Sequence, residues 1–230
     1  MPNPKYRCII FDCDGTLLDT LEDIAATMNR ALLLHGFPQV PVEKYRDMVG
    51  WGIYRLATLA LPEEARTDIN IQTVGDCAAK LLAELPEEKS KTVPYPGISE
   101  LLMELSNYKD SRSKKIALAV LSNKTDSALR RTIGKSFPGI TFDAVYGLRP
   151  GIPAKPDPSM VWELLTEIDN LPQDTIFVGD SEIDIETARN ANCYPLGVSW
   201  GFRTRSVLEA AGAARIIDKP EELWELLGGR

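Results

Sequence analysis

Short apolar runs alternate with helical patterns along most of this 230-residue chain, and this alternation limits the possible fold more than any other feature. The apolar runs are at residues 6–11, 116–121, 144–147, 174–179 and 194–198, and the helical patterns are at about 97–108, 125–134, 157–169 and 181–191. Strands that alternate with helices pair in parallel and carry helices on both faces of the sheet. We therefore predict an α/β protein with a Rossmann-like parallel sheet.

The alternation is interrupted between Asp19 and Val93, where only helical patterns occur, at 21–34, 41–48, 53–60 and 63–85. This insertion directly follows the first strand, and the carboxyl end of a strand in an open α/β sheet faces the ligand crevice. A helical lid is a natural element at that place. We predict a core domain of residues 1–18 and 93–230 and a helical cap domain of residues 19–92.

The composition limits which classes of binding partner and which cellular compartment fit this chain. The net charge of −7 argues against a nucleic acid or an anionic membrane as partner. There is no apolar stretch of membrane-spanning length and no secretory pattern, and four cysteines without paired spacing are typical of a reducing compartment. We expect a cytoplasmic protein, a monomer or homodimer, that acts on a small molecule. The single histidine, His35, excludes a multi-histidine metal site.

Asp12 and Asp14 follow the first apolar run and enter a glycine turn at Gly15. Alternate strand residues point the same way, so the two carboxylates are expected to converge. Their repulsion is relieved by a divalent cation or a raised pKa, and hard oxygen ligands favour Mg²⁺. The pair suits phosphoryl transfer to a carboxylate nucleophile beside a carboxylic acid. The alternative is an ordinary Asp-Gly turn.

Three further polar segments follow predicted strands. Ser122 and Asn123 precede a helix start, which suits a phosphate cradle, although either residue can simply cap that helix. Lys155, just before the next helix, can reach a phosphoryl oxygen or remain solvated. Asp180 ends an apolar run and Asp184 follows one helical turn later, so both can face one ion. An acidic helix N-terminus is the alternative there.

In this order, the four segments resemble the motifs of the haloacid dehalogenase-like hydrolases, and the helical insertion lies at the C1-type cap position of that family. Within the family, the chain is most similar to phosphoglycolate phosphatases. That similarity is carried by Ser122-Asn123-Lys124, Tyr95-Pro96-Gly97 and Gly197-Val198-Ser199-Trp200-Gly201-Phe202. One departure is Ala191-Asn192, where relatives usually have Ala-Gly. Asn tolerates the left-handed conformation, so we expect the fold to be kept.

The resemblance implies a Mg²⁺-dependent phosphomonoester hydrolase with an aspartyl-phosphate intermediate. Asp12 is implied to be the nucleophile and Asp14 the general acid and base. The metal ligands are implied to be the Asp12 carboxylate, the Asp14 backbone carbonyl and the Asp180 carboxylate, with Asp184 mainly in support. Lys155 offsets the charge on Asp12.

The resemblance also implies how substrate is held and selected. The phosphoryl oxygens are implied to contact four residues: Thr16, Ser122, Asn123 and Lys155. A cap loop of Gly50, Trp51 and Gly52 is implied to select the leaving group, and Arg55 is a candidate partner for a substrate carboxylate. The alternative for this loop is a plain helix–helix turn with Trp51 packed into the cap.

Other functions remain open on the same fold. A nucleotidase, a sugar-phosphate phosphatase or a phosphoglucomutase fits the four segments, as does a phosphonoacetaldehyde hydrolase. Relatives of the last two kinds use a cap histidine or lysine, and residues 20–34 contain neither. A non-catalytic phosphate-binding regulatory protein is a further alternative. None of the four motifs lacks a residue, which favours an enzyme.

Overall fold

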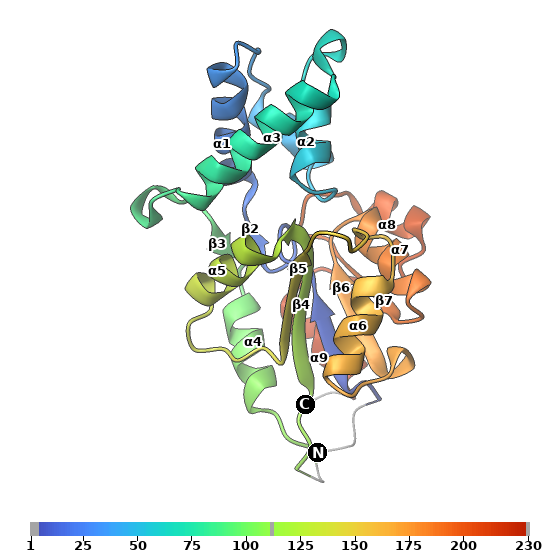
Figure 1. Ribbon diagram of the computed structural model, residues 1–230. Coiled ribbons are helices and arrows are strands. Elements are labelled where there is room, and N and C mark those ends of the chain that lie inside the picture. Colours follow the sequence, from blue (N-terminus) through green and yellow to red (C-terminus); the bar gives the residue numbers. More distant parts are fainter. Residues whose placement is uncertain (1–4, 111–112, 229–230) are drawn as a thin grey trace. The chain divides into compact units, whose positions relative to one another are not determined.

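The computed structural model describes residues 5–110 and 113–228. Within these residues the main sheet has the strand order β5-β4-β1-β6-β7-β8 (Figure 1). The strands are β1 (Cys8–Phe11), β4 (Ala117–Thr125), β5 (Ala144–Leu148), β6 (Thr175–Gly179), β7 (Tyr194–Val198) and β8 (Arg215–Ile217). Every pair of neighbours is parallel. The predicted α/β class with a parallel sheet is confirmed, and β8 is an additional strand.

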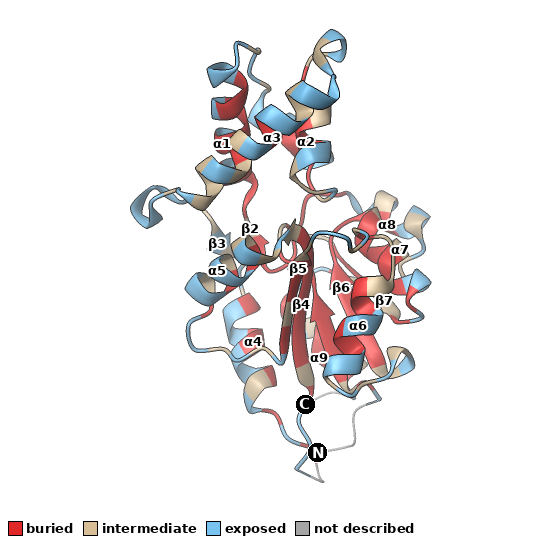
Figure 2. Ribbon diagram, in the orientation of Figure 1, coloured by how far each residue is buried: buried red, intermediate tan, exposed pale blue. Residues whose placement is uncertain are grey.

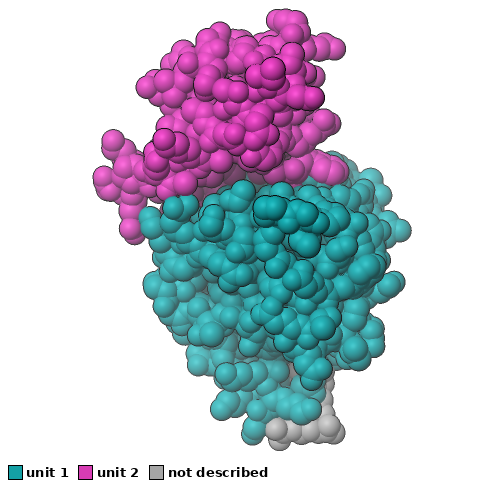
Figure 3. Space-filling model, viewed as in Figure 1, with its two compact units in different colours: residues 1–18, 94–230 teal, residues 19–93 magenta. Residues whose placement is uncertain are grey.

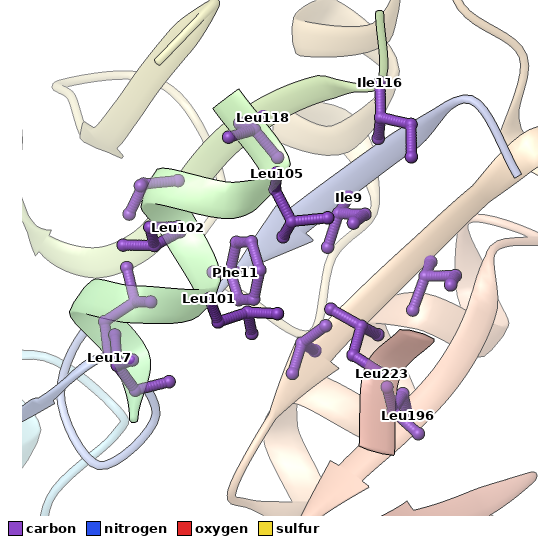
Figure 4. Close-up of a cluster of buried hydrophobic side chains, with 14 of the residues drawn as sticks. Ile9, Phe11, Leu17, Leu101, Leu102, Leu105, Ile116, Leu118, Leu196 and Leu223 are labelled. Atoms are coloured by element: carbon purple, nitrogen blue, oxygen red, sulfur yellow. The ribbon is translucent and has the colours of Figure 1, made fainter. Parts of the chain in front are cut away.

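Helices cover both faces of this sheet, as its buried strands require (Figure 2). Ile9 and Phe11 of β1 pack on one face with α4, α5 and α9, and Figure 4 shows part of this cluster. Cys8 and Ile10 point to the other face, against α6 and α7. The helices of this part are α4 (Ile98–Asn107), α5 (Asp126–Ser136), α6 (Ser159–Glu167), η4 (Pro172–Asp174), α7 (Glu182–Asn190), α8 (Arg205–Ala211), η5 (Pro220–Glu222) and α9 (Leu223–Leu226).

The central strand β1 sets the position of the ligand crevice. Phe11 is in register with Val120 of β4 and with Val178 of β6, so the three strands end together. From β1 the chain proceeds to β4 and β5 on one side and then crosses to β6 on the other. Ligands bind at such a switch in strand order, outside the carboxyl ends of the strands. The residues that follow β1, β4 and β6 are therefore the candidates for a site.

The chain forms two compact units, residues 1–18 with 94–230 and residues 19–93 (Figure 3). The two segments that connect the units form a small sheet, in which β2 (Leu18–Asp19) pairs with β3 (Val93–Pro94). The second unit contains α1 (Leu21–Leu34), η1 (Val42–Asp47), α2 (Ile53–Ala60), η2 (Glu63–Ala65), α3 (Asp68–Ala83) and η3 (Glu87–Lys89). The predicted helix at 63–85 is interrupted because the Thr67 hydroxyl accepts the Asn70 amide at 3.2 Å and caps α3.

Asn192 occupies the left-handed turn that ends α7. Its φ is +60°, and the next amide, from Cys193, donates to the Ala188 carbonyl at 2.8 Å. Glycine is the usual residue in this conformation, and asparagine is among the few others that adopt it readily. The Asn192 departure therefore leaves the helix end intact, as the sequence predicts.

Candidate active site

The four polar segments meet at the carboxyl edge of the main sheet. Asp12 directly follows β1 and extends its ladder, because the Asp12 amide donates to the Val178 carbonyl at 2.9 Å. Ser122 and Asn123 lie in the last part of β4, where its pairing with β5 becomes irregular. Lys155 precedes α6, and Asp180 directly follows β6. All of these residues belong to the unit of residues 1–18 and 94–230.

Lys155 joins two of the carboxylates. Its Nζ donates to Asp12 Oδ1 at 2.8 Å and to Asp184 Oδ1 at 2.6 Å, and all three side chains are buried. Within the described chain, no group donates a hydrogen bond to the other Asp12 oxygen, Oδ2. A buried carboxylate held at one oxygen by a lysine keeps a defined orientation. Its second oxygen is then available as a metal ligand or a nucleophile.

Asp12, Asp180 and Asp184 form a buried acidic cluster. One oxygen from each lies within 4.8 Å of the others. Burial raises the pKa of Asp12 to about 7, with Lys155 opposing the shift and Asp184 adding to it. Burial and the nearby Asp184 also raise the pKa of Asp180 well above its usual range. Protons bind tightly here because negative charge is concentrated away from water, and a cation is favoured for the same reason.

The charges of the cluster match a divalent ion. Asp14 is the fourth carboxylate at this edge, and Lys124 and Lys155 are the two lysines that contact the group. Two negative charges remain when the four carboxylates are ionised. Oxygen donors with that net charge are the ligand set of Mg²⁺ or Ca²⁺. The residues present therefore fit a hard divalent cation.

Asp180 is held by two loops. Its Oδ1 accepts the Thr16 hydroxyl at 3.2 Å, and its Oδ2 accepts the Phe202 amide at 2.7 Å. The indole Nε1 of Trp200 donates to the Thr16 carbonyl at 3.0 Å and ties the two loops together. In this structure the Thr16 hydroxyl thus orients Asp180. The segment 200–202 has this positioning role in addition to the residues named from the sequence.

Asp184 is part of a capping box at the start of α7. Its Oδ2 accepts the amide and the hydroxyl of Ser181 at 3.1 and 2.6 Å. Gly179 leaves room for this arrangement, because a Cβ at Gly179 would lie 2.1 Å from the Asp184 Cβ. Asp184 is therefore fixed from both sides, by Ser181 and by Lys155. This agrees with a supporting position rather than with free movement toward a ligand.

The side chains of Asn123 and Ser122 form hydrogen bonds with the backbone of the two lysines, Lys155 and Lys124. The Asn123 carboxamide accepts the Lys155 amide at 2.8 Å and donates to the Lys155 carbonyl at 3.2 Å. The Ser122 hydroxyl accepts the Lys124 amide at 3.3 Å. The side chain of Asn123 thus holds the backbone that presents Lys155. Both side chains are buried at the carboxyl edge of the sheet.

Sequence reasoning assigned no role to Lys124. Its Nζ donates to both oxygens of Asp14, at 2.8 and 2.9 Å. The carboxylate raises the pKa of Lys124 although burial works in the opposite direction. The only available indication in the sequence was its place directly after Ser122-Asn123. Pattern alone does not say toward which carboxylate a long, flexible side chain turns.

The predicted selectivity residues lie in the other unit. Gly50, Trp51 and Gly52 form the connection between η1 and α2, and Arg55 lies in the first turn of α2. The two glycines have φ of +117° and +86°, which favours glycine over other residues. Trp51 is 38% exposed, so part of its side chain faces solvent.

Comparison with known proteins assigns this chain to one family. The family model of haloacid dehalogenase-like hydrolases matches residues 9–198. The phosphoglycolate phosphatase of Pseudomonas putida is 28% identical over 229 residues, which is 99% of this chain and 81% of that protein. The Synechococcus elongatus phosphoglycolate phosphatase is 27% identical over 95% of this chain and 96% of its own length.

A crystal structure from Lactobacillus delbrueckii subsp. bulgaricus, provisionally named a phosphoglycolate phosphatase, is also similar. It superposes with a TM-score of 0.86 at 32% identity, and covers 97% of this chain and 99% of its own. The family predicted from the four motifs is therefore confirmed, and so is an enzyme that catalyses hydrolysis. With a family model that spans most of its length, the chain belongs to the haloacid dehalogenase-like hydrolases.

Proposed function

We propose that this protein is a Mg²⁺-dependent phosphatase that hydrolyses a small phosphomonoester through an aspartyl phosphate on Asp12. One observation carries the proposal: Asp12 is held by Lys155 at one oxygen, has its other oxygen available, and lies in a buried carboxylate cluster. The family match and the relatives named phosphatases support the same class of reaction.

We assign the metal to Asp12, Asp180 and the backbone carbonyl of Asp14, with Asp184 in support. Bound Mg²⁺ would offset the charge of the cluster and of the phosphoryl group. Mg²⁺ is preferred over Ca²⁺ in this proposal because its shorter bonds and stricter octahedral geometry hold the nucleophile and the phosphoryl oxygen closer together.

The reaction then has two steps. An oxygen of the Asp12 carboxylate attacks phosphorus while the bond to the leaving oxygen breaks and Asp14 gives that oxygen a proton. Water next attacks the phosphorus of the aspartyl phosphate while Asp14 takes a proton from that water, and the bond between phosphorus and Asp12 breaks to release inorganic phosphate and the free carboxylate. Lys155 keeps Asp12 oriented and, with Ser122, Thr16 and Asn123, lies at the edge where the phosphoryl oxygens would bind. Such positioning and charge stabilisation account for most phosphoryl-transfer catalysis.

Phosphoglycolate, or a similar small carboxylated ester, is the substrate we propose. The names of the relatives support it, and the second unit offers Arg55 as a partner for a carboxylate. No helix in the described residues is long and apolar enough to cross a membrane. Free cysteines at positions 8, 13, 77 and 193 fit a reducing cytoplasm, where we place the enzyme.

The proposal is tested with Asp12→Asn and a panel of phosphate esters, assayed with and without Mg²⁺. Turnover is expected to fall at least about a thousandfold, or about 4 kcal/mol in the barrier, because the variant lacks its nucleophile and a metal ligand. Beryllofluoride with Mg²⁺ mimics the aspartyl phosphate and is expected to raise the melting temperature of the wild type only.

Asp68→Asn is the matched control, since Asp68 is an exposed residue of the second unit. The control is expected to keep full activity, and circular dichroism checks that both variants fold. If Asp12→Asn kept more than about a tenth of the activity, Asp12 would not be the nucleophile. A wild type without Mg²⁺-dependent turnover of any ester would instead indicate the non-catalytic alternative.

A further inference from the structure

Lys124 lies in the last part of β4, and its side chain reaches Asp14 in the loop that follows β1. Its Nζ contacts both oxygens of Asp14, at 2.8 and 2.9 Å, and the two side chains are only 10% and 12% exposed. The contact is favoured by the register of the sheet, in which Phe11 of β1 pairs with Val120 of β4. Because β1 and β4 are neighbouring parallel strands, the loop that carries Asp14 follows β1 beside the last part of β4, which carries Lys124.

The two lysines of the site have different partners. Lys155 binds Asp12 and Asp184, whereas the carboxylate that Lys124 binds is Asp14. The Lys124 ammonium lies within hydrogen-bond distance of both Asp14 oxygens and is shielded from water, so this charge-assisted contact restrains the Asp14 carboxylate. The Ser122 hydroxyl, which accepts the Lys124 amide, holds the backbone from which this contact is made.

We propose that Lys124 is a positioning residue that sets the orientation of the Asp14 carboxylate for its two proton transfers. This inference rests on the proposed function, in which Asp14 is the general acid and base. Lys124 forms and breaks no covalent bond: the proton passes between Asp14 and the leaving oxygen or water. A displacement of about 1 Å in a catalytic group can lower the rate about a hundredfold, so a fixed orientation of the Asp14 carboxylate is needed for fast turnover.

Lys124→Met removes the charged partner and keeps most of the side-chain volume. For an alkyl phosphate, kcat is expected to fall about a hundredfold while KM changes less than about threefold, because Asp14 acts in the chemical steps. For p-nitrophenyl phosphate, the first step needs less acid help. The variant should then give a burst of p-nitrophenol and accumulate phosphorylated protein, since Asp14 is also needed to activate water.

A double-mutant cycle with Asp14→Asn separates positioning from direct substrate contact. If Lys124 acts through Asp14, Lys124→Met lowers the rate of alkyl phosphate turnover about a hundredfold when Asp14 is present, but less than about threefold in the Asp14→Asn background. An equal loss in both backgrounds would overturn the proposal. A raised KM with unchanged kcat would overturn it as well, because Lys124 would then bind the substrate itself.

Lys115→Met is the matched control: this exposed lysine precedes β4 at the opposite end of the strand, and normal kinetics are expected. Lys124→Arg keeps a cation and is expected to recover at least tenfold over Lys124→Met. If Lys124→Met does not fold, the cycle is run with Lys124→Arg, whose different geometry should alter kcat only when Asp14 is present. Asp12→Asn decides the proposed function separately. An inactive Asp12→Asn beside a wild-type-like Lys124→Met would overturn the positioning role alone.

Discussion

At the scale of single residues, the geometry of the acidic cluster depends on two glycines, Gly15 and Gly201, that leave room for Asp180. A Cβ at Gly201 would lie 2.2 Å from the Asp180 Cβ and 2.5 Å from the Gly15 carbonyl oxygen. A Cβ at Gly15, whose φ is +92°, would lie 2.3 Å from an oxygen of Asp180. Backbone thus packs directly against the carboxylate, and added atoms at these positions would displace it.

Gly201→Ala is therefore expected to weaken Mg²⁺ binding at least about tenfold, or about 1.4 kcal/mol, because Asp180 must move. Isothermal titration of Mg²⁺ measures the effect. Gly134→Ala in α5 is the control, since nothing lies within 4 Å of a Cβ there. It should bind Mg²⁺ normally and unfold at a slightly higher temperature, as alanine favours helix by about 1 kcal/mol. Unchanged affinity in Gly201→Ala would argue that Asp180 is not a ligand.

At the scale of elements, Asp23 joins the start of α1 to the segment that returns from the second unit. Its carboxylate accepts the Ser90 hydroxyl at 2.6 Å, the Lys91 amide at 2.9 Å and the Thr92 hydroxyl at 2.7 Å. Burial alone would raise the pKa of Asp23, but these hydrogen bonds to the ionised form outweigh burial and lower it. The ionised carboxylate is therefore the form that stabilises the connection.

Because its pKa is lowered on folding, Asp23 binds fewer protons in the folded protein than in the unfolded chain. The stabilisation from its hydrogen bonds is therefore complete above the ordinary pKa of about 4 and is lost as pH falls below that value. Asp23→Asn is expected to lower the melting temperature at pH 7 by roughly 5 °C. The difference from wild type should shrink at about pH 3. Glu22→Gln is the control, because the ion pair of Glu22 with Lys91 is exposed to solvent and its loss should change stability little. A difference that does not depend on pH would contradict this interpretation.

At the scale of the whole molecule, the chemistry and the proposed selectivity belong to different units of the chain. The carboxylates lie in residues 1–18 and 94–230, and Trp51 and Arg55 lie in residues 19–93. Both of these side chains are exposed, so their removal should have little effect on folding. We propose that the second unit acts as a cap that selects the leaving group during turnover.

Arg55→Met is accordingly expected to lower kcat/KM for phosphoglycolate about tenfold relative to ethyl phosphate, which has no carboxylate. Trp51→Ala should change the ranking of substrates in the same panel. Ile69→Ala is the control, an exposed apolar residue of α3 that is 78% accessible, and it should leave the ranking intact. If both variants rank the esters as the wild type does, selectivity resides in the core unit, for example near Trp200.

The local pattern of the chain was sufficient to predict the parallel sheet and the meeting of the four segments. Apolar runs separated by helices form parallel strands, and parallel strands bring their carboxyl ends to one edge, so Asp12, Ser122 and Asp180 were expected at the same edge of the sheet. The left-handed turn at Asn192 was predictable for a similar reason, because it depends on one residue type and its own backbone.

Only the tertiary structure decided which side chains pair within that edge. Lys124 and Lys155 are both long and flexible, and the register of β1 with β4, together with the Asn123 contact, directs one to Asp14 and the other to Asp12 and Asp184. The close approach of Gly201 to Asp180 joins β6 and β7 in the same way. Such contacts depend on strand order and on packing between residues distant in the chain, and local periodicity contains neither.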